Sequence, residues 1–150
     1  MGLFSKRFEL KKEYFDSCFN INETEIYNRR KKHGFNVTKY IDGGAVHIKA
    51  ERKSFLSTFT ITNSKSVFGN HEECVFDVYE MFSLNDAMIF LKQNFTPVPE
   101  NVRFKFPDGV FRDYYIPSFY LPDGNVLALK NSTSSSWFSL HIISKDRILR

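Results

Sequence analysis

The tripeptide Pro-Asp-Gly occurs twice in this 150-residue chain, at 107–109 and 122–124, and alternating apolar residues precede each copy. Proline presets φ for a tight turn, the aspartate side chain bonds back to the backbone, and glycine takes the left-handed position. Each copy therefore predicts a hairpin between two antiparallel strands. Because two copies are too few for a repeat array, we expect successive hairpins of an antiparallel meander.

Further strands are expected where apolar and polar side chains alternate with a period of two. Asp42-Gly43-Gly44 separates two such runs and is itself a hairpin signal, since glycine tolerates positive φ. A loop is expected at Asn131–Ser136. The expected strands are Val37–Asp42, Ala45–Ala50, Phe55–Thr62, Cys74–Glu80, Val126–Leu129 and Trp137–Ser144.

One main helix is predicted at 83–95. Ser83 is a suitable N-cap, and Asp86 stands at the capping-box spacing. Pro97 and Pro99 follow and end the helix. The residues that recur at helical spacing and form one apolar face are Leu84, Ala87, Met88, Leu91 and Phe95.

One or two helices are expected near the N-terminus. Asn22 with Glu25 repeats the N-cap signature, and Gly34 is a stop signal, so a helix from Asn22 to about His33 is predicted. Its apolar content is small, which predicts a surface helix held by a narrow contact. An earlier segment, Phe8–Phe19, is a second helix candidate.

The composition supports a sheet-rich fold. The chain contains 17 Phe and only four Ala, whereas Ala is the best helix former and aromatic residues favour strands. Hydrophobic residues make up 42% and charged residues 25%, which excludes disordered and collagen-like chains. We therefore predict one α+β domain over residues 1–150, an antiparallel sheet packed by the 83–95 helix.

The sequence indicates a cytoplasmic protein with no membrane segment. No apolar stretch of signal-peptide length follows the basic residues near Met1, and the longest unbroken apolar run is Ala87–Leu91. A membrane-spanning helix needs about 20 apolar residues. Two cysteines, Cys18 and Cys74, are too few for a disulfide framework. The oligomeric state is not predicted.

Motifs for nucleotide binding, zinc proteases and serine hydrolases are missing, so no cofactor is expected. His71-Glu72-Glu73-Cys74 contains ligand-type residues, but the simpler interpretation is a turn that leads into a strand, and we expect no metal site. An enzyme remains one alternative. It would be a small hydrolase or ribonuclease-like protein that uses His47 and His141 as acid and base, or Cys74 as nucleophile.

Nucleic-acid binding is a second alternative. The densest basic run is Arg29, Arg30, Lys31 and Lys32, followed by His33, and it could contact phosphates. The net charge of +4 and the pI near 9.0 are marginal for this function. A solvated helix end explains the same run.

The stretch 110–121 carries the largest aromatic excess. Its rings would occupy both faces of a strand, whereas a sheet with one solvated face needs only one such row. Burial under the 83–95 helix is the simpler explanation, and exposure for a protein partner is the alternative. The residues expected at a partner-binding surface are Phe111, Arg112, Tyr114, Tyr115, Phe119 and Tyr120.

These features favour a non-enzymatic protein-binding domain of bacterial type. The charge is basic over residues 1–53, acidic over 54–100 and basic again over 101–150, which gives a partner complementary handles for fast association. A small domain without catalytic motifs fits an immunity protein, an inhibitor that neutralises a cognate toxin by stoichiometric docking. This is the function that the sequence favours.

Overall fold

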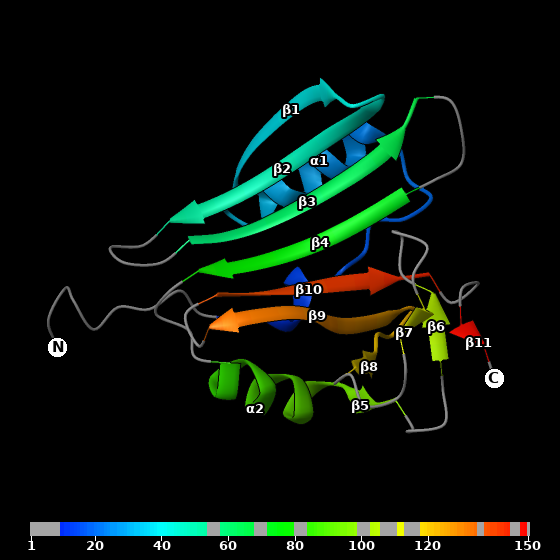
Figure 1. Ribbon diagram of the computed structural model, residues 1–150. Coiled ribbons are helices and arrows are strands. Elements are labelled where there is room, and N and C mark those ends of the chain that lie inside the picture. The colour runs from blue at the N-terminus through cyan, green and yellow to red at the C-terminus, as the bar shows by residue number, and fades with distance from the viewer. Residues whose placement is uncertain are drawn as a thin grey trace, which may run out of the picture.

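A long antiparallel sheet dominates the computed structural model of the protein (Figure 1). The eight strands of this sheet are hydrogen-bonded in the order β1-β2-β3-β4-β10-β9-β8-β5, and three further strands form a small sheet in the order β11-β6-β7. Together with two α-helices, this architecture confirms the predicted α+β class. The structure describes residues 10–53, 58–67, 72–79, 84–98, 103–105, 111–112, 118–134, 137–144 and 148–149.

Every strand pair of the two sheets is antiparallel. The chain runs through the first four strands in order, leaves the sheet after β4, and returns to pair β10 with β4. The strands are β1 (Asn36–Asp42), β2 (Ala45–Lys53), β3 (Thr58–Ser66), β4 (Glu72–Tyr79), β5 (Thr96–Pro97), β6 (Arg103–Lys105), β7 (Phe111–Arg112), β8 (Ser118–Tyr120), β9 (Val126–Ser134), β10 (Trp137–Ile143) and β11 (Ile148–Leu149).

Both Pro-Asp-Gly copies join antiparallel neighbours, as predicted. The second copy links β8 to β9, and Gly124 takes a φ of +89° there. The first copy lies outside the described residues, but β6 and β7 on either side of it are paired. The two hairpins belong to different sheets, so they are not one continuous meander. The expected loop Asn131–Ser136 is wrong in part, because β9 extends through Ser134.

Helix α1 (Glu23–Lys32) confirms the helix predicted from Asn22 to His33. The side chain of Asn22 caps it by accepting a hydrogen bond from the N–H of Glu25 at 2.8 Å. In Figure 1 the helix lies behind β2 and β3. Two of its side chains are completely buried, Ile26 and Arg30. The contact with the sheet is therefore narrow, as expected, but it contains a charged residue.

The prediction of a helix over Phe8–Phe19 is wrong. Within its described part only a short 3-10 helix forms, Lys12–Tyr14, and the chain then continues without regular structure. The carbonyl groups of this segment are bound by a distant side chain instead of by helical N–H groups, since Arg30 donates to the carbonyls of Tyr14 and Asp16. Four side chains of the segment nevertheless lie in the core. These buried residues are Tyr14, Phe15, Ser17 and Cys18.

Helix α2 (Leu84–Asn94) confirms the main predicted helix. Ala87 and Leu91, two residues of the expected apolar face, are each 1% exposed. The helix packs against the N-terminal segment, since the ring centroids of Phe15 and Phe90 lie 5.7 Å apart. The 14–18 segment therefore fills the core between the helices.

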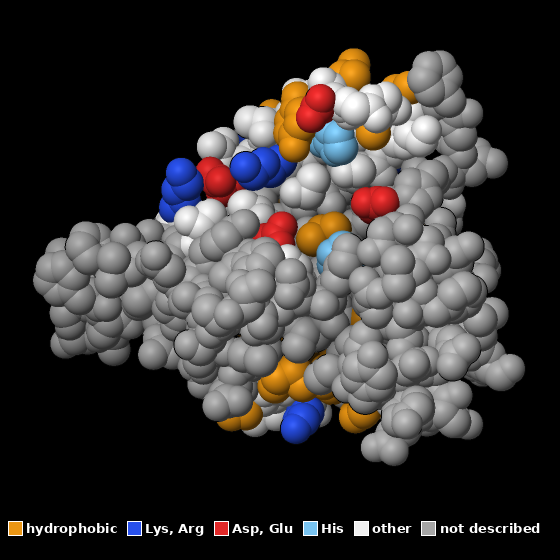
Figure 2. Space-filling model, viewed as in Figure 1, with side chains coloured by type: hydrophobic (Ala, Val, Ile, Leu, Met, Phe, Trp, Pro, Cys, Tyr) orange, Lys and Arg blue, Asp and Glu red, His pale blue; other side chains and the backbone are white. Residues whose placement is uncertain are grey.

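The two faces of the sheet carry different side chains. The inner face, which α1 and the 14–18 segment cover, buries Ile48, Phe59, Phe76 and Leu140. On the outer face the alternate positions of the same strands carry mostly polar side chains, which are half-buried. Figure 2 views this outer face. Functional groups on it are accessible, whereas those on the inner face belong to the core.

Candidate functional site

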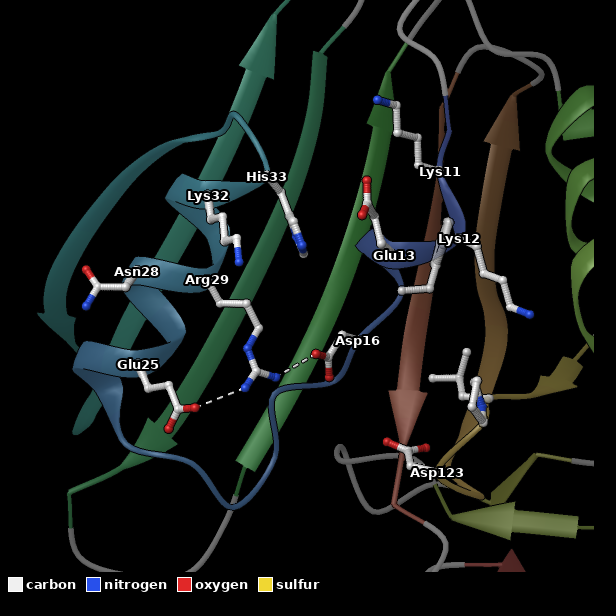
Figure 3. Close-up of a pocket in the computed structure, with 13 residues that line it drawn as sticks. Lys11, Lys12, Glu13, Asp16, Glu25, Asn28, Arg29, Lys32, His33 and Asp123 are labelled. Carbon is white, nitrogen blue, oxygen red and sulfur yellow. Dashed lines mark hydrogen bonds and ion pairs between the residues drawn. The ribbon is translucent and has the colours of Figure 1, made fainter.

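A groove of about 940 Å³ opens between three segments of the chain (Figure 3). We call it the charged groove. Its residues come from the segment before α1, from α1 itself and from the turn after β8. They are Lys11, Lys12, Glu13, Phe15, Asp16, Glu25, Asn28, Arg29, Lys32, His33, Leu121, Pro122 and Asp123.

Arg29 holds two carboxylates of the charged groove. Its guanidinium lies 2.7 Å from Asp16 Oδ2 and 3.0 Å from Glu25 Oε1, as the dashed lines in Figure 3 show. Burial opposes ionisation of Asp16, but the Cys18 N–H and the Arg29 guanidinium hold the pKa of this carboxyl below its usual value. Among the described residues, the lining has as many carboxylates as Lys and Arg side chains. The groove is therefore not a track of positive charge.

The environment of His33 in the charged groove disfavours the protonated form of its ring. Burial lowers the pKa of His33, the nearby carboxylate of Glu13 opposes this, and the charge of Arg30 adds to it. The Nδ1 atom is buried and has no hydrogen-bond partner among the described residues. The ring therefore favours the neutral form and is a poor site for an anion.

The predicted basic patch Arg29–Lys32 is not one surface. Arg30 is 0% exposed, so its assignment to the patch is wrong. Arg29 is engaged by two carboxylates, and the ammonium of Lys31 lies 5.6 Å from the ring centroid of Tyr27. Because consecutive side chains of a helix point around its circumference, one of the four cations, Arg30, points into the core. The patch presents fewer free charges to phosphates than the sequence suggests.

Arg30 joins three parts of the inner core. Its guanidinium donates hydrogen bonds to the carbonyl of Asp16 at 2.8 Å, to Asn63 Oδ1 at 3.0 Å and to the carbonyl of Tyr14 at 3.4 Å. Asn63 in turn donates to the carbonyl of Ser17 at 2.7 Å. The irregular 14–18 segment is therefore tied to both α1 and β3 by side chains that satisfy its carbonyl groups.

The predicted aromatic surface is only partly described. Tyr114 and Tyr115 lie outside the described residues, and only the backbone of Phe111 and Arg112 in β7 is described. Phe119 is 3% exposed and belongs to the main core, so its ring is not available to a partner in this structure.

Tyr120 is half-buried against a small second core of Val126, Ala128 and Ile143. The rest of the aromatic surface stays a prediction.

A second pocket, of about 560 Å³, lies on the outer face beside the turn between β1 and β2. We call it the hairpin pocket. Within it His47 Nδ1 lies 2.7 Å from Ser64 Oγ, and His47 Nε2 lies 3.0 Å from the carbonyl oxygen of Asp42. The lining residues are Asp42, Gly43, Gly44, Ala45, His47, Ser64, Ser66 and Glu73.

Sheet register brings this group together. Tyr40, His47, Ser64 and Glu73 are successive cross-strand partners on β1, β2, β3 and β4. The rings of Tyr40 and His47 are stacked, with centroids 4.9 Å apart. Cross-strand partners point to the same face, so the four side chains form one row on the outer face.

The two enzyme arrangements expected from the sequence, a His47–His141 pair and a Cys74 nucleophile, are not assembled in this structure. His141 lies on β10, three strands from His47, which corresponds to a separation of about 14 Å. The two histidines therefore do not form an acid–base pair. Cys74 is 1% exposed on the inner face, and burial raises the pKa of its thiol to about 12. A nucleophilic cysteine needs a lowered pKa and access to substrate, and Cys74 has neither.

Exposed apolar side chains gather at the same corner of the sheet. Tyr40 is 43% exposed, Ile41 73% and Val67 48%, and the N–H of Val67 donates to the carbonyl of Gly44 in the β1–β2 turn. We call Tyr40, Ile41 and Val67 the hairpin corner. Figure 2 shows hydrophobic side chains at this upper end of the sheet, next to acidic and histidine side chains.

Sequence reasoning missed the roles of Tyr40, Ile41 and Ser64. A signal existed for the first, because a two-residue Gly-Gly loop fixes the register and places Tyr40 opposite His47. Ser64 had no comparable signal, since the register between β2 and β3 depends on a connection that no turn motif specifies.

Comparisons with known proteins give no family: no family model, no curated protein and no solved structure matches this chain. Within the described residues, no helix is long and apolar enough to cross a membrane. No three His, Cys, Asp or Glu residues of that part of the chain converge on a possible metal position. His71 lies outside the described residues. Function must therefore be argued from the two pockets and the hairpin corner.

Proposed function

We propose that the protein is a protein-binding domain that docks one partner through the hairpin corner. The observation that carries the proposal is the exposure of Ile41, which places 73% of a large apolar side chain in water. Tyr40, on the other face of β1, and Val67, whose N–H donates to the carbonyl of Gly44, are exposed at the same end of the sheet. Clustered exposed apolar side chains, in contrast to single ones, are typical of interaction sites.

The position of β1 supports docking at this place. It is an edge strand of the eight-stranded sheet, and of its seven residues only Val37 is buried. An edge strand has unpaired backbone groups that can receive a strand of another protein. Asp42 and Lys39, whose ammonium lies 2.8 Å from Glu23 Oε2, flank the apolar side chains along β1 with charge of both signs. Such a charged rim favours fast and selective association with a complementary partner.

As the specific form of this function we propose a bacterial immunity protein, which neutralises a cognate toxin by forming a stoichiometric complex. Burial and ion pairing within the basic run 29–32 support a protein partner over a nucleic acid. Arg30 is buried and Arg29 is held by two carboxylates, so half of the four cations are not free to contact phosphates. Nucleic-acid affinity depends on the number of such contacts.

The experiment identifies the partner from the surface itself. A photo-crosslinking amino acid is placed at position 41 in one variant and at position 53 in another, and both variants are expressed in the native cells. Lys53 is the control because its side chain is exposed at the opposite end of β2. We expect one protein to be crosslinked at position 41 and not at position 53.

Affinity for the captured protein then tests the surface. The side chain of Ile41 is 73% exposed, and complete burial of an isoleucine contributes about 1.5–3 kcal/mol, so Ile41→Asp should raise Kd by at least about 6- to 40-fold. Ile89→Asp is the matched control, because Ile89 is 54% exposed on α2. Equal losses in both variants, or no loss in Ile41→Asp, would contradict the proposal.

The immunity role has its own test. Expression of the captured partner alone should arrest bacterial growth, and co-expression of the wild-type chain should restore it. Ile41→Asp should restore growth poorly, whereas Ile89→Asp should act as the wild type. A captured partner without any toxicity would keep the docking function and remove the immunity role.

A further inference from the structure

The hairpin pocket has the arrangement of a nucleophile, a base and an orienting group. Ser64 Oγ lies 2.7 Å from His47 Nδ1. The carbonyl of Asp42 can only accept a hydrogen bond, so His47 Nε2, 3.0 Å away, carries a proton and donates it. In the neutral ring this leaves Nδ1 as the acceptor of the Ser64 hydroxyl hydrogen. Nucleophilic serines are activated by an adjacent base in this way.

The imidazole is held in place from a second direction. The ring of Tyr40 stacks on His47 with an interplanar angle of 27° and a centroid distance of 4.9 Å. The hydrogen bond to the Asp42 carbonyl and this stacking together fix both the tautomer and the plane of the ring. A base that is oriented in advance does not have to be ordered during the reaction.

The lining of the pocket indicates the charge of its substrate. Asp42 and Glu73 contribute carboxylates, and none of the described residues that line this pocket is Lys or Arg. Glu73 is the direct cross-strand partner of Ser64, so their Cβ atoms lie about 4.5–5.5 Å apart. A positively charged group of a substrate whose carbonyl carbon lies at Ser64 would therefore sit beside a carboxylate.

We propose that Ser64 and His47 form a catalytic pair that hydrolyses carboxylic esters bearing a positive charge. This activity goes beyond docking and does not depend on it, because Ile41 takes no part in the pair. It also differs from the non-enzymatic function expected from the sequence, because it uses a residue pair that the sequence did not reveal.

In the first half of the reaction, the Ser64 oxygen attacks the ester carbonyl carbon while its proton passes to His47 Nδ1. The carbon–oxygen bond to the alcohol then breaks. His47 returns the proton to the departing alkoxide, so an alcohol leaves and an acyl group stays on Ser64.

In the second half, water attacks the acyl carbon and gives a proton to His47. The bond to Ser64 breaks, and His47 protonates the serine oxygen. Ester and water have become a carboxylic acid and an alcohol, with the protein unchanged.

The first experiment maps the nucleophile on the wild-type chain. The purified full-length protein is incubated with a fluorophosphonate probe, and the adduct is located by peptide mass spectrometry. We expect one adduct, on Ser64. An adduct on another serine, or none, would overturn the proposal, and this result does not require any variant to fold.

The second experiment measures turnover of acetylcholine and of 3,3-dimethylbutyl acetate, its uncharged isostere, by acid release. Ser64→Ala and His47→Gln should abolish hydrolysis of both. Thr62→Ala is the control, since Thr62 lies on the same strand and face but does not line the pocket. Equal turnover by Ser64→Ala and Thr62→Ala would refute the catalytic role of Ser64.

The third experiment tests the substrate charge. Glu73→Gln should lower the ratio of kcat/KM for acetylcholine over the isostere by about tenfold, as expected for loss of one partly screened charge contact. An unchanged ratio would refute the role of Glu73 and the positively charged substrate. Ile41→Asp should lose partner binding and keep normal ester hydrolysis, and Ser64→Ala should do the reverse. The two functions can therefore fail independently of each other.

Discussion

Replacement of Arg30 by methionine tests how the core tolerates a completely buried cation. Arg30 is 0% exposed, and its hydrogen-bond partners are the carbonyls of Tyr14 and Asp16 and the amide oxygen of Asn63. None of these partners is a carboxylate. Its neighbour Arg29, in contrast, forms ion pairs with two carboxylates near the surface. A count of ion pairs would therefore rank Arg29 as the more important residue, and we expect the opposite.

The magnitude follows from the contacts. Arg30→Met removes two short hydrogen bonds from a charged donor, which contribute about 1.5–3 kcal/mol each, or roughly 3–6 kcal/mol together. It also removes a buried charge, and replacement of buried ionic groups by apolar side chains can return about 1–4 kcal/mol. The expected net loss in the free energy of unfolding is about 2 kcal/mol. For Arg29→Met, exposed ion pairs predict a loss below about 1 kcal/mol.

Urea denaturation followed by circular dichroism gives the free energies of both variants. With an m-value of about 2 kcal/mol/M, Arg30→Met should lower the midpoint by about 1 M. The m-value should stay constant, so that the shift reports stability alone. Equal stability of Arg30→Met and the wild type, or a larger loss in Arg29→Met, would refute the view that Arg30 holds the 14–18 segment in place.

Three further predictions concern titration and thiol access. Because the folded pKa of Asp16 is lowered, its contribution to stability is present above the unfolded pKa of about 3.9 and is lost as pH falls through the folded value. Asp16→Asn should therefore destabilise the fold at pH 7 and have no effect on stability at low pH. Urea midpoints measured across this pH range test the prediction. The folded pKa of His33 is lowered too, so below about pH 6.5 the unfolded chain binds a proton that the folded chain does not. The stability of the wild type should therefore decrease as pH falls below this value. In thermal melts, His33→Gln should show a smaller decrease. Cys18 and Cys74 are buried with raised pKa values, so neither should react with a thiol reagent at pH 8 until urea unfolds the chain, and labelling of the native protein would contradict their burial.

Much of the fold could be predicted because local signals agreed with the final structure. The Asn22 cap and the apolar spacing of 84–95 specified two helices, and the Gly43-Gly44 turn, with both φ values positive, specified the first hairpin. The 14–18 segment could not be predicted in the same way. Its aromatic spacing resembles a helix, but its carbonyls find partners in Arg30 and Asn63, residues far away in sequence.

The candidate sites could be predicted far less well. The sequence singled out His47 as a candidate but paired it with His141, because the distance between strands is not visible before their order is known. Ser64 became a candidate only when β2 and β3 were aligned. Arg30 was expected at the surface, since a charged residue on a polar helix is normally solvated. Sites assembled by register and by tertiary burial have no local signature.

The outer face of the sheet is divided into a covered apolar end and an accessible polar end. Near β8, β9 and β10 this face is apolar and covered: Val126, Ala128 and Ile143 are each 0% exposed, with Val98 and Tyr120 packed against them. Along β2 and β3 the same face carries half-buried polar side chains, and β1 beside them is largely exposed. A partner or a substrate can therefore approach the outer face at the β1–β4 end. The His47–Ser64 pair lies on this outer face, whereas Ile41, the residue after Tyr40, points to the opposite face of the edge strand β1. A substitution at Ile41 or at Ser64 should therefore separate docking from chemistry.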